Sequence, residues 1–539
     1  MKNLLFLLIL VLSINCKPKM TNDDNLEVNQ ATIGKHLKSL ASDEFMGRMP
    51  FTEGEVKTVN YLKDEFSKLG LEPGNGESFY QDVPMIEITG LVSDKMIISG
   101  PKGDFNLSYF DDFVASTTKA EEEVSLENSE LVFAGYGIVA PEYGWNDYEG
   151  IDWKGKTAVV LVNDPGFNSG DSSLFKGDEM TYYGRWTYKY EEAGRQGAAG
   201  IIIIHETIPA AYGWNVIQSS NTGPQLNLSS NAPVTDIQGW ITHETANKLF
   251  EASTAEINDY QKLASNKDFK PIPLGLKTSV KIKNTIKNDI SKNVIAILPG
   301  TDLKDEYIIY SAHWDHLGIG KPIDNDSIYN GANDNASGVA CLLAIAEAFK
   351  NNKQPKRSVV FLAVTAEEQG LLGSAYYSEH PIFAAQKTVA NINMDGLLTP
   401  GKMKDLTITG FGHSEMDEYA KTEAEKLGRY IIPDPEAEKG YFFRSDHFNF
   451  AKIGIPALYA SGSYESIEKG IDYAQQMSDE YREKRYHQPS DEYNAEKTDL
   501  SGAQFDAQLL FNVGYKLANE DYFPKWHDTS EFKSARENK

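Results

Sequence analysis

The sequence predicts an α/β fold, in which a mostly parallel or mixed sheet is flanked by helices and interrupted by an inserted β-rich domain. Beyond about residue 278, apolar runs typical of buried strands alternate with segments of helical periodicity. The strands are EYIIYSA, SVVFLAV and VANINM, and the helices between them are ASGVACLLAIAEAFK and GLLGSAYYSEH. The length of 539 residues exceeds what one hydrophobic core usually supports, so we expect two globular units.

A change in the sequence pattern, from helical periodicity to short β-type runs, predicts the inserted domain. Residues 121–277 carry short β-type runs such as LVFAGYGIV, KTAVVLV and AGIIIIH, separated by loops rich in Gly, Pro, Asn and Asp. We assign residues 26–120 and 278–520 to the α/β domain, which is therefore discontinuous. Residues 521–539 are expected to be a polar tail, of which the last residues, DTSEFKSARENK, are frayed.

The first 16 residues are typical of an export signal. Lys2 precedes a continuous apolar run from Leu4 to Leu12, and residues 17–25 form a polar linker behind it. The run is about half of the roughly 20 residues that a membrane-spanning helix needs. We therefore expect an exported protein rather than one with a transmembrane anchor.

The two cysteines are expected to have different environments. Cys16 stands directly behind the export segment, an arrangement that resembles the lipobox of bacterial lipoproteins, in which this cysteine is acylated. The resemblance implies a periplasmic, outer-membrane or cell-surface lipoprotein that contacts the membrane only through its lipid anchor. Ser13 and Asn15 depart from the leucine and the small residue that the motif prefers. Cys341 lies in an apolar helix and is expected in the core, without a disulfide.

The net charge excludes one class of partner. With 52 basic and 78 acidic residues the chain carries −26 at pH 7, a field that repels the phosphate backbone of nucleic acid. The same acidity serves to keep an exported protein soluble, so it does not by itself identify a substrate.

Acidic residues and a histidine follow three strands of the predicted sheet. His313 ends the first strand with Asp315 two residues later, Glu367 and Glu368 follow the next, and Asp395 follows the third. Ligands gather at the carboxyl ends of strands in open α/β sheets. If Glu367 and Glu368 lie in extended backbone, their side chains point in opposite directions. Taken singly, each residue also fits a structural histidine or an acidic first helical turn.

Two further segments add ligand-type side chains. Asp334 stands in GANDNASG just before a helix, where it could also be a helix cap, and His487 follows Tyr486 in KRYHQPSD. Carboxylates and imidazoles from several separate segments are what a two-metal site with mixed oxygen and nitrogen ligands requires. Their joint presence favours a metal site over independent structural roles.

The ordered motifs HWDH, NDNASG, AEEQGLLGS, NMDG and YHQPSD resemble the co-catalytic zinc aminopeptidase family. This family includes bacterial leucyl aminopeptidases and is related to glutamate carboxypeptidase, glutaminyl cyclase and the transferrin receptor ectodomain. The resemblance covers residues of about 280–515, and LASDEFMGR resembles the N-terminal start of the same domain. It implies the zinc-peptidase, phosphorylase/hydrolase-like fold. The inserted segment resembles a protease-associated domain.

The resemblance implies two Zn²⁺ ions and a role for each site residue. His313 and Asp395 are expected on one zinc, Glu368 and His487 on the other, and Asp334 as the bridge. Further implied roles are Glu367 as the general base that acts on metal-activated water, Tyr486 as a stabiliser of the oxyanion, and Asp315 as the hydrogen-bond acceptor that fixes the tautomer of His313.

The expected reaction is removal of residues from free peptide N-termini, and three alternatives stay open. A carboxypeptidase on the same scaffold would need cations for the terminal carboxylate, for which Arg185, Arg195 and Arg444 are candidates. A glutaminyl cyclase-like acyltransferase typically has tryptophan where this chain has Tyr486. A non-catalytic, receptor-like binding protein is the third. Manganese or cobalt could replace zinc, and side-chain preference and oligomeric state remain open.

Overall fold

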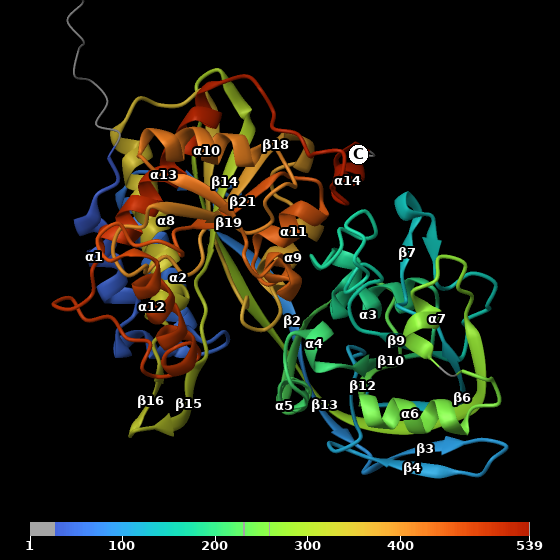
Figure 1. Cartoon of the computed structure of the whole chain (residues 1–539). Coiled ribbons are helices and arrows are strands. Elements are labelled where there is room, and N and C mark those ends of the chain that lie inside the picture. Colours follow the sequence, from blue (N-terminus) through green and yellow to red (C-terminus); the bar gives the residue numbers. More distant parts are fainter. Residues whose placement is uncertain (1–26, 230–231, 258, 538–539) are drawn as a thin grey trace, which may run out of the picture.

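The computed structural model describes residues 27–229, 232–257 and 259–537, which form two bodies joined by long strands (Figure 1). The export segment, the linker and Cys16 lie outside these residues. The connecting strands are β2 (Tyr80–Val92) and β13 (Ile272–Leu298), which pair antiparallel from Val92 opposite Ile282 to Tyr80 opposite Val294. Among the described residues, no helix is long and apolar enough to cross a membrane.

The larger body contains a mixed sheet with the expected parallel centre. β14 (Leu303–His313) lies between β17 (Arg357–Val364) and β18 (Thr388–Asn393) and is parallel to both. β13 pairs antiparallel with the outer edge of β17, and β21 (Ala457–Ser461) continues in parallel from β18. Beyond it lie β19 (Asp405–Ile408), antiparallel to β21, and β20 (Tyr430–Pro433). The predicted fold class is confirmed.

Side chains of the strands alternate between two hydrophobic clusters. In β17, Val359 and Phe361 face one cluster and Val360 and Leu362 the other, as the period of two in a strand requires. Because both faces are covered, β17 is buried along its whole length. Helices cover the first face: α1 (Gln30–Leu40), α2 (Glu53–Lys68), α8 (Ser337–Asn351), α10 (Met416–Lys426) and α13 (Ser501–Asn519).

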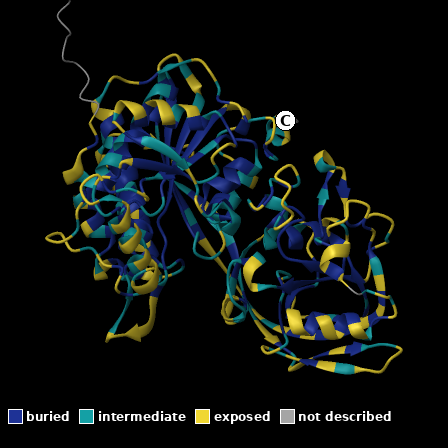
Figure 2. Ribbon diagram, in the orientation of Figure 1, coloured by how far each residue is buried: buried dark blue, intermediate teal, exposed yellow. Residues whose placement is uncertain are grey.

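Helices α9 (Leu372–Glu379) and α11 (His447–Lys452) cover the second face. Helix α8 is apolar all round and is buried between α1, α13 and the sheet, so Cys341 is a free cysteine in the core as expected. The dark interior of both bodies in Figure 2 shows this burial. Other elements of the larger body are β1 (Glu72–Pro73), the hairpin β15 (Gly318–Ile323) and β16 (Asp326–Tyr329), and α12 (Gly470–Lys484).

The second body is β-rich and has hydrophobic clusters of its own. Its strands are β3 (Lys95–Ser99), β4 (Phe105–Ser108), β5 (Phe113–Ser116), β6 (Glu123–Phe133), β7 (Val139–Ala140), β8 (Trp145–Asn146), β9 (Lys156–Leu161), β10 (Gly200–His205), β11 (Pro224–Leu228) and β12 (Ile237–Thr242). Its helices are α3 (Trp186–Arg195), α4 (Thr207–Ala210), α5 (Trp214–Ser220), α6 (His243–Ala252) and α7 (Tyr260–Ala264).

This body begins earlier than the expected residue 121. Val92, Met96 and Phe113 share one core with residues as late as Ile282. Strand β3 pairs with β13 on one side and with β4 on the other, which places the boundary near residue 92. The strands of this region are short and two of them are half exposed, so their alternation alone did not separate them from the larger body.

Besides the two connecting strands, a hydrophobic cluster joins the bodies, and it includes the C-terminal segment. Met180 of the second body packs with Phe442, Phe448, Trp526 and Phe532 of the larger body. The expectation of a frayed tail is therefore wrong for residues 521–537, where two large aromatic side chains are buried. The segment ends in α14 (Lys533–Glu537).

Candidate metal centre

Three parallel strands deliver the predicted acidic edge. His313 is the last residue of β14, Glu367 and Glu368 follow the end of β17, and Asp395 follows the end of β18. Because β14 lies between the other two, these side chains meet at one point. His313 Nε2 lies 3.3 Å from Asp395 Oδ1. The carboxyl ends of the strands thus form one floor, as the sequence predicted.

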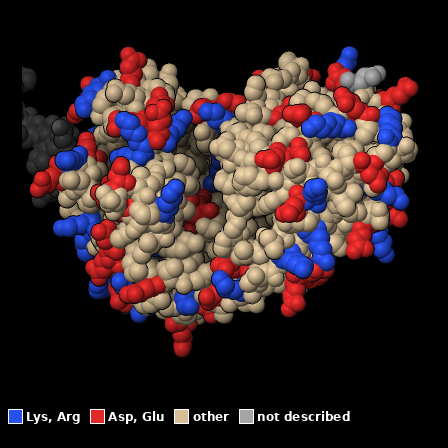
Figure 3. All heavy atoms as spheres, turned by 90° about the horizontal axis from the view of Figure 1, so that it is seen from below, with Lys and Arg blue, Asp and Glu red and all other residues tan. Residues whose placement is uncertain are grey.

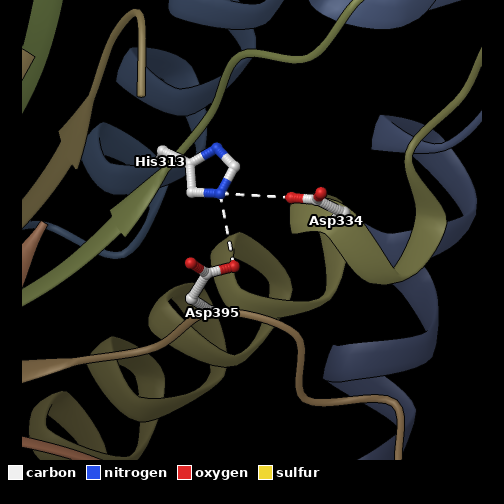
Figure 4. A group of neighbouring side chains, drawn as sticks. All are labelled: His313, Asp334 and Asp395. Atoms are coloured by element: carbon white, nitrogen blue, oxygen red, sulfur yellow. Dashed lines mark hydrogen bonds and ion pairs between the residues drawn. The ribbon is translucent and has the colours of Figure 1, made fainter. Parts of the chain in front are cut away.

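Asp334 occupies the middle of this group. Its Oδ1 lies 3.3 Å from His313 Nε2, and its Oδ2 lies 3.2 Å from His487 Nε2. Figure 4 shows Asp334 and Asp395 converging on the same ring nitrogen of His313. His487 is also 3.1 Å from Glu368 Oε2. One carboxylate therefore faces two histidines, and each histidine has a second carboxylate beside it.

Asp315 has a different contact from the one expected. The Nδ1 atom of His313 lies 3.2 Å from the backbone oxygen of Asp315, whereas the carboxylate is 3.8 Å away. That carboxylate instead accepts from the amides of Glu367 (3.0 Å) and Glu368 (3.3 Å). The backbone carbonyl still favours a proton on Nδ1, while the side chain holds the loop after β17.

Glu367 and Glu368 lie in a turn and not in extended backbone. Strand β17 ends at Val364, Ala366 has φ 50°, and the amides of Gly370 and Leu371 donate to the carbonyl of Glu367. Glu367 lines a cavity of about 1070 Å³, together with Asp334 and Asp395. Glu368 faces the two imidazoles of His316 and His487. The two glutamates thus have separate surroundings, but a turn separates them rather than strand alternation.

Tyr486 lines the same cavity and stacks on His487 with ring centroids 3.9 Å apart. Although the residue is partly exposed, desolvation of its hydroxyl in the cavity, reinforced by Asp334 and Glu368, raises the pKa of that hydroxyl above the usual value. The hydroxyl therefore keeps its proton at neutral pH and can donate a hydrogen bond into the cavity.

Three further residues support the group, and two of them, His316 and Asp491, lie in motifs already singled out. His316 of HWDH is fully buried, with Nδ1 2.6 Å from Glu368 Oε1. Ser445 of FFRSDHF donates to Asp395 Oδ2 at 2.7 Å. Asp491 of YHQPSD accepts from the amide of Asp334 at 3.2 Å. The motif positions of these two were a signal, but the partners of all three depend on tertiary contacts.

Arg48 holds the backbone beneath the cluster. Its buried guanidinium, from the motif LASDEFMGR, donates to four carbonyls: Leu40 (2.7 Å), Trp314 (2.8 Å), Asn330 (2.6 Å) and Gly331 (3.0 Å). Trp314 follows His313, and Gly331 precedes Asp334 by three residues. One side chain therefore fastens two loops that carry site residues. The guanidinium also brings positive charge near the carboxylates of Asp315 and Asp334.

The cluster holds more acid than base in a buried space. Burial, opposed by His313 and reinforced by Asp395, raises the pKa of Glu367 well above its usual value. Burial alone would lower the pKa of His487, but Asp334 and Glu368 raise it to about 10. A bound cation would relieve the repulsion among the carboxylates of this cluster.

The donor set fits a metal. Among the described residues, ligand atoms of His313, Asp334 and Asp395, of His313, Glu367 and Glu368, and of His316, Asp334 and Glu368 each lie within 4.8 Å of one another. The buried Nε2 of His487 has no hydrogen-bond partner of accepted geometry in the described part of the chain, although two carboxylates are near. Carboxylate oxygen with imidazole nitrogen is a ligand set suited to zinc.

Comparison with known proteins decides the family. Residues 293–511 match the profile of peptidase family M28. This segment belongs to that family. The M28 segment contains every predicted metal ligand from His313 to His487, so the family resemblance of the motifs is confirmed.

Curated proteins similar to part of this chain include two aminopeptidases. Aminopeptidase NAALADL1 of Mus musculus is 35% identical over 129 residues, which are 23% of this chain and 16% of that protein. Aminopeptidase YwaD of Bacillus subtilis (strain 168) is 30% identical over 189 residues, 34% of this chain and 38% of that protein. This chain spans less than half the length of both curated relatives. A solved aminopeptidase from Aneurinibacillus sp. strain AM-1 aligns with a TM-score of 0.48 and 18% identity, covering 92% of this chain and 96% of that chain.

Replacing Arg48 tests whether its side chain holds the loops beneath the acidic cluster. Arg48→Met leaves four carbonyls without their donor, and each buried polar group left unsatisfied costs about 1–3 kcal/mol. We expect the free energy of unfolding to fall by several kcal/mol in urea titrations. Arg195→Met is the control, because Arg195 is 45% exposed and pairs with Glu191 and Glu192. Equal stability of the two variants would contradict this role.

Proposed function

We propose that this chain is an exported metallopeptidase that removes residues from free peptide N-termini with two zinc ions. The observation that carries the proposal is the position of Asp334, whose two oxygens face His313 and His487 at the edge of a large cavity. Membership of the segment in peptidase family M28 and its aminopeptidase relatives support the same reaction. We also propose that the second body is a protease-associated domain.

The contacts within the cluster support the metal ligands that we propose. His313 and Asp395 would hold one zinc, Glu368 and His487 the other, and Asp334 would bind both. The charge of zinc, when bound, polarises a substrate carbonyl and makes water a stronger acid. His316 would hold the Glu368 carboxylate in place, and Ser445 would do the same for Asp395.

Two residues of the chain would act on the peptide itself. Glu367 lines the cavity. With the repulsion among the carboxylates relieved by bound cations, its carboxylate would accept a proton from the attacking water and return it to the leaving amine. Tyr486, which keeps its hydroxyl proton, would donate a hydrogen bond to the oxyanion that develops on the scissile carbonyl. The acidic floor also attracts the ammonium of a free N-terminus.

The two adjacent glutamates should differ when each is changed to Gln. Glu367→Gln removes the proposed general base and should lower turnover by about 10² to 10⁴ while the zinc content stays unchanged. Glu368→Gln should instead weaken zinc binding, because its carboxylate faces both His316 and His487. Steady-state kinetics and metal analysis of both proteins measure this. Equal metal loss in the two variants would refute the division of labour.

Metal analysis tests the bridging position of Asp334. We expect about two zinc ions per chain, loss of activity on dialysis against a chelator, and recovery when zinc is added. Asp334→Asn should reduce the bound zinc, whereas Asp499→Asn, in the same cavity but outside the cluster, should not. A fully active protein with one ion, to which a second adds no rate, would rule out the bridge.

Blocking the peptide ends tests the direction of cleavage. One peptide series carries free or acetylated N-termini and free or amidated C-termini. We expect acetylation to abolish cleavage, because it removes the ammonium charge. Cleavage that survives acetylation and is lost on amidation would instead identify a carboxypeptidase. Absence of hydrolysis with zinc present would favour a binding protein.

A fourth experiment tests the proposed anchor. We propose that lipid on Cys16 holds the protein at the periplasmic or outer cell surface, because Cys16 directly follows the export segment. Cys16→Ser should move the protein from the membrane fraction to the soluble fraction. If the unaltered protein is already soluble after cell fractionation, the anchor does not exist.

A further inference from the structure

The C-terminal segment brings a buried acidic side chain to the junction of the two bodies. Glu531 precedes Phe532, which packs in the aromatic cluster that joins the bodies, and the Glu531 side chain is only 6% exposed. Figure 1 shows α14 and the C-terminus on the side of the larger body that faces the second body. The space-filling view shows, from below, a groove between the two halves of the molecule (Figure 3). Glu531 therefore lies where its side chain can contact both bodies.

Lys176 of the second body forms an ion pair with Glu531. Its Nζ lies 3.1 Å from Glu531 Oε2, without hydrogen-bond geometry, and 3.5 Å from Glu179 Oε1. The other oxygen of Glu531 accepts from the amide of Tyr182, also of the second body, at 3.4 Å. Burial acts to lower the pKa of Lys176, but Glu531 and Glu179 raise it above the usual value, so the ammonium is charged at neutral pH. Removing one member of such a buried pair leaves the other charge without compensation.

His413 of the larger body completes the contact. Its Nε2 lies 3.2 Å from Lys176 Nζ, and its Nδ1 lies 3.1 Å from Ser530 Oγ. Burial, reinforced by Lys176, lowers the pKa of His413 to about 4, so the ring is neutral at neutral pH and its Nε2 can accept a hydrogen bond from the ammonium. The same ring stacks on Phe442 with centroids 4.8 Å apart. Lys176 therefore connects the C-terminal segment with the segment that carries Phe442.

The loop that carries Lys176 has a strained backbone. Phe175 (φ 45°), Lys176 (φ 61°) and Gly177 (φ 68°) are three consecutive residues in the left-handed region. Bulky side chains rarely adopt this region, and they persist there only where the surrounding contacts determine the conformation. Phe175 is fully buried and stacks on Tyr143 with centroids 4.2 Å apart. Contacts in the second body therefore hold one residue of the strained pair, and contacts at the junction hold the other.

The segment around Phe442 forms one wall of the cavity that contains the acidic cluster. Its neighbours Tyr441 and Arg444 line this cavity. Ser445 lines it as well and donates to Asp395 Oδ2 at 2.7 Å. The position of Phe442 against His413 therefore sets the position of the wall beside the candidate metal centre.

We propose that Lys176 and Glu531 are positioning residues, which hold the wall formed by residues 441–445 and thereby the binding site for the peptide beyond its first residue. The cavity of about 1070 Å³ exceeds the roughly 300–1,000 Å³ of small-ligand pockets, so it can hold several residues of a peptide. The acidic cluster stands on the central sheet, so the contact should affect peptide binding more than the chemical step. This inference rests on the proposed peptidase function and adds to it the residues that set a preference for longer peptides.

Substrates of two lengths test this role in the full-length enzyme. Lys176→Met and Glu531→Gln should each lower the ratio of kcat/KM for Leu-Gly-Gly-Gly-Gly to that for leucine amide by about tenfold, mainly through KM of the pentapeptide. The double variant should recover part of the loss, because neither charge is left without its partner. Lys270→Met is the matched control, because Lys270 belongs to the second body and pairs with Glu149 in an exposed position. An unchanged ratio, an equal loss in the control or an additive loss in the double variant would overturn the role.

Hydrogen exchange separates this inference from the proposed activity, because it needs no turnover. The amide of Met180 donates to the carbonyl of Ala437 at 3.3 Å, a backbone hydrogen bond between the two bodies. In Glu531→Gln we expect the amides of residues 176–182 and 437–445 to exchange about tenfold faster, while those of β14 do not change. This result would support the positioning role even if no peptide were hydrolysed. Unchanged exchange in both segments, or an equal increase in β14, would refute it even if hydrolysis were observed.

Discussion

The crowding of five acidic side chains into one buried space is the constraint on which the site depends. Asp315, Glu367, Glu368 and Asp395 follow the ends of three adjacent strands, and Asp334, from the segment before α8, lies among them beside His313. Carboxylates this close repel one another, so the fold must hold them by contacts that do not depend on their charge. Arg48 does so through backbone carbonyls, and Asp315 does so through backbone amides. The protein itself therefore preorganises the arrangement that a cation then stabilises.

The sequence patterns predicted the central sheet and the positions of the site residues. Buried strands alternating with helices are a strong signal. Every ligand-type residue except His487, which lies in the loop after α12, follows such a strand or precedes a helix, so their positions along the chain predicted their proximity in space. The contacts of individual atoms were not accessible in this way. Asp315 holds two amides rather than the ring of His313, because the loop after β17 turns back at Ala366, a local conformation that no residue pattern indicated.

The errors at the domain boundaries have a common cause. The strands of residues 95–116 are short, so the sequence pattern favoured assigning them to the α/β domain. The C-terminal segment is mostly polar, so its composition predicted a frayed end. In the structure a few large apolar residues decide otherwise. Trp526 and Phe532 each add one side chain to a cluster whose other members come from both bodies. Long-range packing of this kind leaves almost no local trace in the sequence.

The antiparallel pairing of β2 with β13 has a consequence for the independence of the two bodies. Because Val92 lies opposite Ile282, the chain enters and leaves the second body at points only about 5 Å apart. A turn of a few residues can span that distance, so the larger body has no geometric need of the roughly 190 residues between them. The aromatic cluster opposes such a separation, since it would lose Met180 and Tyr182, the two side chains that the second body contributes to it. The topology would therefore allow the second body to be removed, but the aromatic cluster ties it to the larger body.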